Sequence, residues 1–318
     1  MFSRKIVLPA LAVAGVTMTL AATPLYGQAG GDGGPPRIVW AAQAEPETAW
    51  TAPNRPVTHL ADILKAHKGQ QSWEHKVLLT RDYDGRYNSL APGETTKAQF
   101  YADDRCFMWV YSGQMKVTID GQQPFTATKG FLIDVAPRLS YKLENTGSEP
   151  VVFWRVTPAG QLPSYPVSET PTPVKGFKYV QSKITETGGY EGVNQPYLDF
   201  NAYAAGGGKS RDFAYDGHTS AHIIRAGAIK ELPPADRWGH FHENMVEAWV
   251  VIEGQLDVLV SGKGIVSGQF GDVIMVPTGR WHRATSHPNS GPSTRLAMTP
   301  RLKEGQVHYM QVDGPAGN

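Results

Sequence analysis

The feature that most constrains the fold is an internal repeat shared by the two halves of the chain. Each half has a strand-like run, a glycine, a second short run, a turn, and a glycine that opens an apolar strand ending at a proline. The landmarks are Gly113, Gly130 and Pro137 in the first half and Gly254, Gly271 and Pro277 in the second. The two glycines are 17 residues apart in both halves. A repeat of roughly 100 residues made of short strands predicts two barrels or sandwiches side by side.

The composition agrees with short strands and many turns. The 318 residues include 34 Gly and 24 Pro, which disfavour long helices. With 41% hydrophobic and 19% charged residues, the chain is expected to fold. Strands are predicted over residues 76–80, 107–111, 116–119, 130–135, 151–156, 222–229, 248–252, 256–260, 272–276 and 294–298. One helix is expected around Leu60, Ile63 and Leu64, before Gly69. The predicted fold class is all-β, with two jelly-roll barrels in one chain.

Breaks in the strand pattern predict the domain boundaries. Residues 59–160 are expected to form the first barrel and residues 211–318 the second. The segment 161–210 begins with several prolines and is predicted to be a linker. Residues 30–58 begin with a glycine-rich stretch and are predicted to be a flexible leader.

The first 29 residues have the features of an export signal. Arg4 and Lys5 precede an apolar stretch over residues 6–22, and small residues at 27–29 offer a cleavage site. An uncleaved membrane anchor is the alternative, but the apolar stretch is slightly short of the roughly 20 residues of a span and contains Pro9. We therefore predict a periplasmic or secreted protein, with the signal cleaved near Ala29.

The charge balance argues against a nucleic-acid partner. The chain has 30 basic and 29 acidic residues, and loss of Arg4 and Lys5 with the signal changes its net charge from +1 to −1. Nucleic-acid binders normally carry a basic face, and this sequence has no basic run. No second segment is apolar enough for a membrane span, so no membrane partner is expected after signal removal. Association into a homo-oligomer stays open.

The second half contains residues that predict a metal site. His240 and His242 are two positions apart, so on a strand their side chains point to the same face. Glu247 begins the next apolar strand, and His282 follows Pro277 by five residues. If neighbouring strands of a closed barrel carry these residues, all four point inward and can meet. We predict that His240, His242, Glu247 and His282 bind one divalent metal ion.

Three imidazoles and one carboxylate form a ligand set of intermediate softness. It suits Fe, Mn, Cu, Ni or Zn, and the sequence does not choose among these metals. With a metal that takes six ligands, four protein ligands leave two positions for water, substrate or dioxygen. Open positions distinguish a catalytic metal site from a closed structural one.

The spacing of these residues resembles two motifs of the cupin superfamily. The matching segments are His240-x-His242-x4-Glu247-x6-Gly254 and Gly271-x5-Pro277-x-Gly279-x2-His282. Two positions depart from the usual pattern, because Pro234 replaces the leading Gly and Ser286 stands where Asn is frequent. The resemblance implies a small β-barrel with the metal inside, and it carries the four residues over as the ligands.

The first half fits the same template without the ligands. The positions that match the template are Gly93, Gln99, Tyr101, Cys106, Gly113, Gly130, Pro137 and Tyr141, with one residue inserted before Pro137. The resemblance therefore covers about residues 60–310 and implies a bicupin whose N-terminal barrel lacks a metal. Cys106 is the single cysteine, and we expect a small buried apolar residue there rather than a reactive thiol or a ligand.

Four residues around the predicted ligands are candidates for a substrate pocket. Trp249 and Val251 share the inward face of the strand that begins at Glu247, where they would form an apolar wall or ordinary core packing. His222 lies on an earlier strand and would either orient a ligand or be structural. Arg280 lies in the turn before His282, where it would reach a substrate anion or, as we favour, lie in solvent.

These features together predict an exported metalloenzyme that acts on a small oxygen-rich compound. Cupins that keep three His and one Glu include dioxygenases, oxalate decarboxylases and sugar-related isomerases, and the tryptophan wall favours a dioxygenase of phenolic compounds. Glu247 is the candidate catalytic residue, because a carboxylate ligand can also take up a proton. The alternatives are a metal-dependent lyase, decarboxylase or isomerase, and a module that binds a metal or ligand without catalysis.

Overall fold

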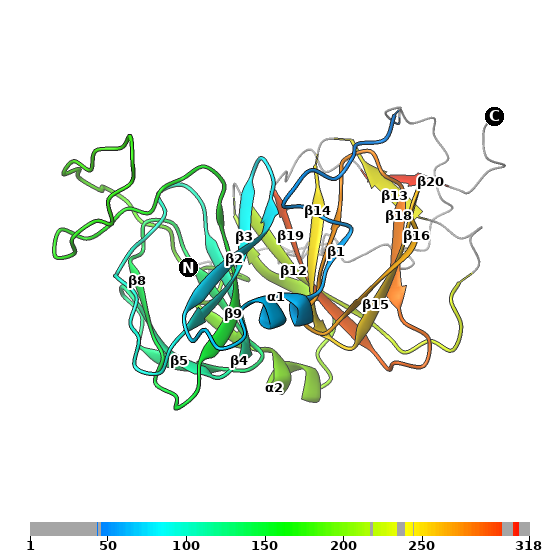
Figure 1. The fold of residues 1–318 in the computed structure, drawn as a ribbon, viewed down its shortest axis with the longest axis horizontal. Helices are drawn as coiled ribbons and strands as arrows, with labels where there is room; N and C mark the ends of the chain where they lie inside the picture. The colour runs from blue at the N-terminus through cyan, green and yellow to red at the C-terminus, as the bar shows by residue number, and fades with distance from the viewer. Residues whose placement is uncertain are drawn as a thin grey trace, which may run out of the picture. The chain divides into compact units, whose positions relative to one another are not determined.

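The first barrel is built from short antiparallel strands (Figure 1). In β5 (Gln114–Ile119), Met115, Val117 and Ile119 are buried and the residues between them are exposed, as in a strand with one face on a core. The other strands are β2 (Trp73–Leu79), β3 (Tyr83–Leu90), β4 (Cys106–Ser112), β6 (Phe125–Thr128), β7 (Phe131–Val135), β8 (Tyr141–Glu144) and β9 (Val151–Pro158). Together with β10 (Tyr197–Asp199), these strands form two sheets in the orders β10-β7-β4-β9-β3-β2 and β6-β5-β8, which enclose an apolar core.

The second barrel repeats this plan. Its strands are β11 (Arg211–Tyr215), β12 (Thr219–Ala226), β13 (Gly239–His242), β14 (Glu247–Glu253), β15 (Gln255–Val260), β16 (Gly264–Gln269), β17 (Val273–Val276), β18 (His282–Ser286), β19 (Ser293–Pro300) and β20 (His308–Gln311). Together with β1 (Val57–Thr58), they form sheets in the orders β1-β17-β14-β19-β12-β11 and β16-β15-β18-β13-β20, which enclose a second apolar core. The prediction of an all-β fold with two jelly-roll barrels is confirmed.

This computed structural model describes residues 43, 46–216, 219–233, 239–243, 245–300 and 308–311. The predicted signal, residues 1–29, and the first part of the predicted leader lie outside the described residues. Two short helices are present in the described part, α1 (Leu60–Ala66) and α2 (Phe200–Ala205). The sequence predicts α1 but not α2. In the described part of the chain, no helix is both long enough and apolar enough to cross a bilayer.

Each barrel receives an edge strand from the segment that precedes the other barrel. β1 (Val57–Thr58) lies before the first barrel but pairs with β17 of the second. β10 (Tyr197–Asp199) lies before the second barrel but pairs with β7 of the first. The predicted leader and linker are therefore corrected at these points, since both contain strand that belongs to a sheet. The pairing energy comes from a partner strand far away in the sequence, so local composition gives no sign of it.

An apolar cluster joins the two barrels. It contains Trp109 and Trp154 from the first barrel together with Val250 and Met298 from the second, all buried. Two tyrosine hydroxyls of β3 cross the junction: Tyr83 donates to the Thr299 carbonyl at 2.5 Å, and Tyr87 donates to the Gly271 carbonyl. A buried Tyr is stabilised when its hydroxyl finds an acceptor, so these contacts fix β3 against the second barrel.

Candidate metal centre

The four predicted ligands come from three strands of the second barrel. His240 on β13 lies opposite His282 on β18 in the antiparallel pair of these strands, and His242 shares the face of His240. Glu247 is the first residue of β14, which belongs to the other sheet. The carboxylate therefore meets the imidazoles inside the barrel. His242, Glu247 and His282 are buried, whereas the His240 side chain is 20% exposed, so the cluster opens to solvent beside His240.

The three imidazoles converge on one carboxylate oxygen. Glu247 Oε2 lies 2.9 Å from His242 Nε2, 3.0 Å from His282 Nε2 and 3.6 Å from His240 Nε2. One donor atom from each of the four residues lies within 4.8 Å of the others. The predicted ligands are thus brought together, and they form a group that could hold a metal ion.

Hydrogen bonds outside the cluster orient two of its members. Trp249 Nε1 donates to Glu247 Oε1 at 2.9 Å, which leaves Oε2 for the histidines. His282 Nδ1 lies 2.9 Å from the Arg280 carbonyl oxygen. Because a carbonyl can only accept, this contact is a hydrogen bond when the proton of His282 is on Nδ1, and it directs Nε2 towards the centre. Such partners hold metal ligands in orientation in many metal sites.

The electrostatics of the cluster favour the protonation states that a metal requires. Burial lowers the pKa of His240, with a smaller opposite effect from Glu247, so this ring is neutral at pH 7. Burial by itself would raise the pKa of Glu247, but its interactions with the three histidines outweigh this effect and hold that pKa well below its usual value. Neutral imidazoles and a charged carboxylate are the forms that bind divalent metals.

The donor set fits a divalent transition metal ion. Three imidazole nitrogens that face a single carboxylate oxygen need either protons or a cation between them. His282 already uses its Nδ1 proton on the Arg280 carbonyl, so a second proton on Nε2 would make a buried imidazolium. Burying a charge is costly, and a metal ion shared by all four groups avoids that cost for the ring.

Two of the four predicted pocket residues lie on the face of β14 that carries Glu247. Trp249 contributes more than an apolar wall, because its indole N–H binds Glu247 and its ring centroid lies 5.7 Å from that of His282. Val251 is fully buried in the apolar core of the barrel. Its placement matches the core-packing alternative.

The other two predicted pocket residues are engaged elsewhere. His222 Nδ1 lies 2.5 Å from Asp212 Oδ1 on the neighbouring strand β11, so its ring is held by that carboxylate and does not orient a ligand. The Arg280 guanidinium binds Glu47 and the Thr48 and Ser261 carbonyls, and it stacks on Trp50 at 4.4 Å. This corrects both expectations for Arg280. Its side chain fastens the segment around Trp50, and only its carbonyl serves the cluster.

One residue near the cluster was not predicted from the sequence. Arg295 on β19 lies opposite Val251 of β14, and its guanidinium carbon is 5.1 Å from the centroid of the Trp249 ring. A period-two count along β19 would have found it, because Arg295 shares a face with Ala297, which lies in the core of the second barrel.

The corresponding positions of the first barrel also come together, but with different chemistry. Gln99 and Tyr141 form a bridge like that of His240 and His282, and Gln99 Nε2 donates to the Tyr141 hydroxyl at 3.0 Å. Cys106 Sγ lies 3.7 Å from the same hydroxyl. Burial raises the pKa of Cys106 to about 11, so the thiol stays protonated at pH 7. This is the buried apolar cysteine that the sequence predicts.

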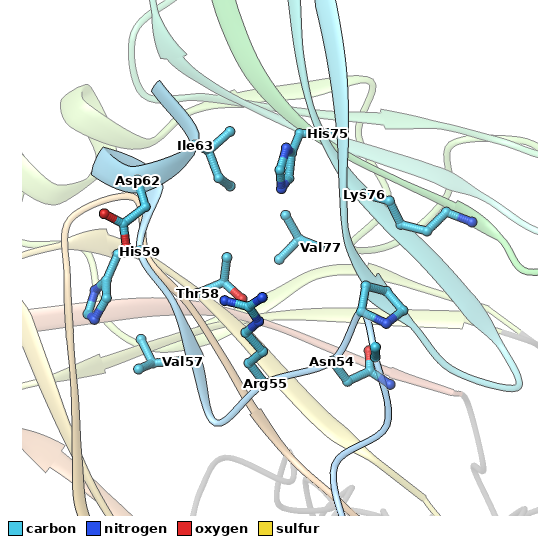
Figure 2. A pocket seen from close by; sticks show the side chains of 12 residues that line it. Asn54, Arg55, Val57, Thr58, His59, Asp62, Ile63, His75, Lys76 and Val77 are labelled. Carbon is cyan, nitrogen blue, oxygen red and sulfur yellow. The ribbon is translucent and has the colours of Figure 1, made fainter. Parts of the chain in front are cut away.

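A cavity of about 340 Å³ lies away from the cluster, between the segment around β1 and β2 of the first barrel. Figure 2 shows residues of both segments around it, among them Arg55, His59, His75 and Lys76. His59 and Lys76 are already paired, with Asp272 and Asp84 respectively. None of the predicted site residues lines this cavity.

Comparisons with known proteins agree with the geometry of the centre. Residues 228–294, which include all four clustered residues, match a family model described as a cupin domain. No curated protein matches the chain. The part of the second barrel that matches a cupin domain is therefore the part that contains the candidate metal centre.

Several solved structures have the same fold. A cupin 2 conserved barrel domain protein from Leptotrichia buccalis is 12% identical, with 82% of this chain and 100% of that chain covered and a TM-score of 0.50. Salicylate 1,2-dioxygenase from Pseudoaminobacter salicylatoxidans is 11% identical over 81% and 84%, with a TM-score of 0.54. A variant of oxalate decarboxylase from Bacillus subtilis is 13% identical over 84% and 81%, with a TM-score of 0.49. The two structures with TM-scores of 0.50 and 0.54 show that this chain has their fold, with two cupin-type barrels in one chain.

Proposed function

We propose that the second barrel holds one divalent transition metal ion through His240, His242, Glu247 and His282. The observation that carries this proposal is the convergence of three imidazole Nε2 atoms on Glu247 Oε2. Fe, Mn, Cu, Ni and Zn all suit three nitrogens and one oxygen. The first barrel offers an amide, two phenols and a protonated thiol at the same positions, so we expect one ion per chain.

The reaction we propose is that of a dioxygenase-like oxidoreductase acting on a small oxygen-rich compound, phenolic in character. When bound, the metal would supply Lewis acidity and, as Fe or Cu, redox chemistry with dioxygen. Four protein ligands leave two of six positions open, which a structural site would not need. The aromatic ring of Trp249 beside the cluster favours a planar compound. Salicylate 1,2-dioxygenase, whose structure was solved with gentisate, uses the same fold.

The residues around the ion have separate tasks in this proposal. The Trp249 N–H holds the Glu247 carboxylate in one orientation, and the Arg280 carbonyl fixes the tautomer of His282. Buried Val251 and its apolar neighbours keep water away from one side of the cluster. The lowered pKa of Glu247 keeps the carboxylate charged, which favours its ligand role over proton transfer.

Metal analysis with matched variants tests the proposal. Wild-type protein is expected to contain about one metal ion per chain. The double variant His240→Ala/His242→Ala should contain almost none, and the matched double variant Gln99→Ala/Tyr101→Ala in the first barrel should keep it. A metal content that survives the histidine changes, or a second ion lost with Gln99 and Tyr101, would contradict the proposal.

The reaction class needs its own measurement. Metal-loaded protein that consumes dioxygen with a phenolic compound supports the dioxygenase proposal. Turnover without dioxygen would indicate the lyase, decarboxylase or isomerase alternative. Metal-dependent ligand binding without any product would indicate a binding module.

We also propose export, on the strength of the signal features in residues 1–29. Expression of the full chain followed by cell fractionation and N-terminal sequencing tests it. A mature protein outside the cytoplasm that starts close to residue 30 is expected. Retention in the cytoplasm with an intact N-terminus would refute export and leave the metal proposal untouched.

A further inference from the structure

A guanidinium lies inside the second barrel beside the metal centre. Along β19, Leu296 and Met298 pack into the cluster that joins the barrels, while Ala297 packs into the core of the second barrel. Arg295 alternates with Leu296 and so faces the same interior as Ala297. Its guanidinium carbon lies 5.1 Å from the centroid of the Trp249 ring, and Trp249 in turn binds Glu247. One aromatic side chain therefore separates Arg295 from a predicted metal ligand.

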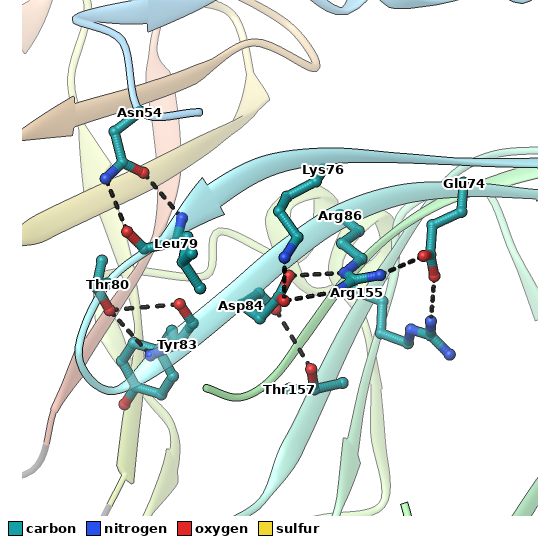
Figure 3. A network of polar contacts seen from close by, with 10 residues as sticks. All are labelled: Asn54, Glu74, Lys76, Leu79, Thr80, Tyr83, Asp84, Arg86, Arg155 and Thr157. Atoms are coloured by element: carbon teal, nitrogen blue, oxygen red, sulfur yellow. Dashed lines mark hydrogen bonds and ion pairs between the residues drawn. The ribbon is translucent and has the colours of Figure 1, made fainter. Parts of the chain in front are cut away.

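Several partly or fully buried arginines have a carboxylate partner, whereas Arg295 has none among the described residues. Arg105 is paired with Asp134 at 2.7 Å and with Asp216 at 2.6 Å, and Arg225 is paired with Glu253 at 2.9 Å. Arg155, on the corresponding strand of the first barrel, is paired with Glu74 at 2.8 Å, as Figure 3 shows. Within the described part of the chain, the Arg295 guanidinium forms neither an ion pair nor a hydrogen bond; its Nε is buried, and the residue as a whole is partly buried.

An unpaired cation in a protein interior is unfavourable because burial removes its hydration. Burial lowers the pKa of Arg295 to about 10, and the attraction of Glu247 offsets only part of this effect. Stacking on Trp249 supplies a further weak attraction. Glu247 is no ion-pair partner, because its two oxygens are occupied by the three histidines and Trp249.

When a metal ion is bound, the positive charge inside the barrel favours binding of an anion more strongly. Three neutral imidazoles, one carboxylate, a divalent ion and one guanidinium add to a net charge of about +2 inside the barrel. A small anion that enters the barrel would reduce this charge. A guanidinium presents two parallel N–H donors that match a carboxylate, and the apolar side chains of Trp249 and Val251 favour an organic group over a fully hydrated inorganic ion.

We propose that Arg295 binds the carboxylate of a small organic acid that occupies the barrel beside the metal centre. The inference rests on the proposed function, because the same barrel holds the metal. It narrows the substrate class from oxygen-rich compounds in general to organic acids. Arg295 is then a binding residue that selects a charged compound over its neutral analogue.

Binding measurements on metal-loaded full-length protein test this inference. The probes are acetate, glycolate and benzoate, each compared with its amide, and inorganic phosphate as a hydrated anion. Isothermal titration calorimetry gives the affinity for wild-type protein, Arg295→Met, Arg295→Lys and the control Arg211→Met. Arg211 on β11 is a suitable control, because it also lies over an aromatic ring but is not part of the metal cluster. Its guanidinium carbon is 5.8 Å from the centroid of the Tyr203 ring.

We expect at least one carboxylate to bind wild-type protein more tightly than its amide. Arg295→Met should lower the affinity for that carboxylate by about 10- to 100-fold, the usual range for loss of hydrogen bonds to a charged group. The affinity for the amide should stay the same. The carboxylate affinity of Arg295→Lys should lie between those of wild-type protein and Arg295→Met, and the affinity of Arg211→Met should equal that of wild-type protein. Thermal unfolding of Arg295→Met should occur at the same or a higher temperature, because an unpaired buried charge has been removed.

Several results would overturn the inference. They are equal binding of acids and amides, no binding of any acid, binding of phosphate as tight as that of the best carboxylate, and a clear loss of thermal stability or metal in Arg295→Met. The last result would mean that Arg295 holds Trp249 and Glu247 in place. Metal content separates the two proposals, since wild-type protein without metal refutes the proposed function, whereas metal retention with unchanged carboxylate affinity in Arg295→Met refutes only this inference.

Discussion

The two barrels place four side chains at matching points and surround them in opposite ways. The counterparts are 141 positions apart in each case: Gln99 and His240, Tyr101 and His242, Cys106 and Glu247, Tyr141 and His282. In the first barrel, Tyr101, Cys106 and Tyr141 belong to the apolar core. In the second, the four residues form a polar cluster next to the core. At these points the first barrel has the packing of an apolar core, whereas the second has a donor set that could hold a metal ion.

The buried arginines of the two barrels differ in the same direction. Arg155 of the first barrel has Glu74 as a partner, and Glu74 also binds Arg86 (Figure 3). Arg295 of the second barrel has no such carboxylate in the described part of the chain. Arg155 thus has a partner within the chain, whereas Arg295 is the residue that we propose binds an anion. Four predictions test or refine this comparison, from the largest expected effect to the smallest.

Moving the carboxylate into the first barrel should have the largest effect. Cys106→Glu puts a carboxyl group into a core of apolar and tyrosine side chains that contains no histidine. The nearby Arg155 is already paired with Glu74. We expect a loss of roughly 3 kcal/mol or more in the free energy of unfolding, from an uncompensated buried charge and overpacking. Denaturant unfolding measures it. Cys106→Ala is the control, and similar stability of the two variants would show that the first barrel tolerates a ligand.

Removing the charge from the second barrel should abolish tight metal binding. Glu247→Gln keeps the shape of the side chain but loses the negative charge that faces the three histidines. We expect metal affinity to fall by more than the roughly 100-fold that changes to orienting residues can cause. Competition with a coloured chelator measures it. Cys106→Ser at the matching point should keep wild-type affinity, and equal losses in both variants would contradict the difference between the barrels.

Loss of a single orienting hydrogen bond should have a smaller effect. Trp249→Phe removes the N–H that binds Glu247 Oε1 and keeps the aromatic ring. Metal affinity should fall by about 10- to 100-fold. Trp109→Phe is the control in the first barrel, because the Nε1 of Trp109 is buried and makes no hydrogen bond within the described residues. An unchanged affinity in Trp249→Phe would remove Trp249 from the centre.

In metal-free protein, groups of the second barrel should lower the stability at acid pH, and Cys106 of the first barrel should lower it at alkaline pH. Since burial lowers the pKa of His240 below 6.5, the unfolded chain binds a proton there that the folded chain does not, and stability falls as the pH drops below about 6.5. The lowered pKa of Glu247 extends this fall below pH 4.5. Burial raises the pKa of Cys106 from 9.0 to about 11, so stability falls as the pH rises above 9.

Variants assign these two limbs to their barrels. His240→Gln should reduce the loss of unfolding free energy at acid pH, and Cys106→Ala should reduce the loss at alkaline pH. Each reduction should be about 1.4 kcal/mol for every unit of pKa shift removed. Thermal unfolding of chelator-treated protein between pH 4 and 10.5 measures both. If His240→Gln changed the alkaline limb and left the acid limb unaltered, the electrostatic account of the centre would be wrong.

The sequence predicted the cluster of four residues at the candidate metal centre, because these residues follow fixed spacings along the chain. His240 and His242 share a face through the period of two, and the motif that resembles cupins supplied Glu247 and His282. Position along a strand also predicted that Trp249 faces the cluster. Its hydrogen bond to Glu247 was not predicted, because the torsion angles of an indole side chain depend on packing.

The misses have a common cause, which is that they depend on contacts between distant segments. Arg280 was expected in solvent or at a substrate, but Glu47 and Trp50 hold it, and nothing in the turn around residue 280 signals that segment. His222 is bound by Asp212 through a hairpin that the sequence did not predict. The strands β1 and β10 have two and three residues, too few for any local preference to register.

The exchange of β1 and β10 has a consequence for how the chain is made. During synthesis, the β7 edge of the first barrel waits for residues 197–199, which arrive more than 60 residues after β7. β1 waits longer, since Val57 pairs with Ile274. Pairings over such separations are slow to form, and uncovered strand edges attract other chains. The first barrel therefore completes its sheet only after residue 199 has been made, which is well beyond its last own strand, and β1 finds its partner only after residue 274 has been made.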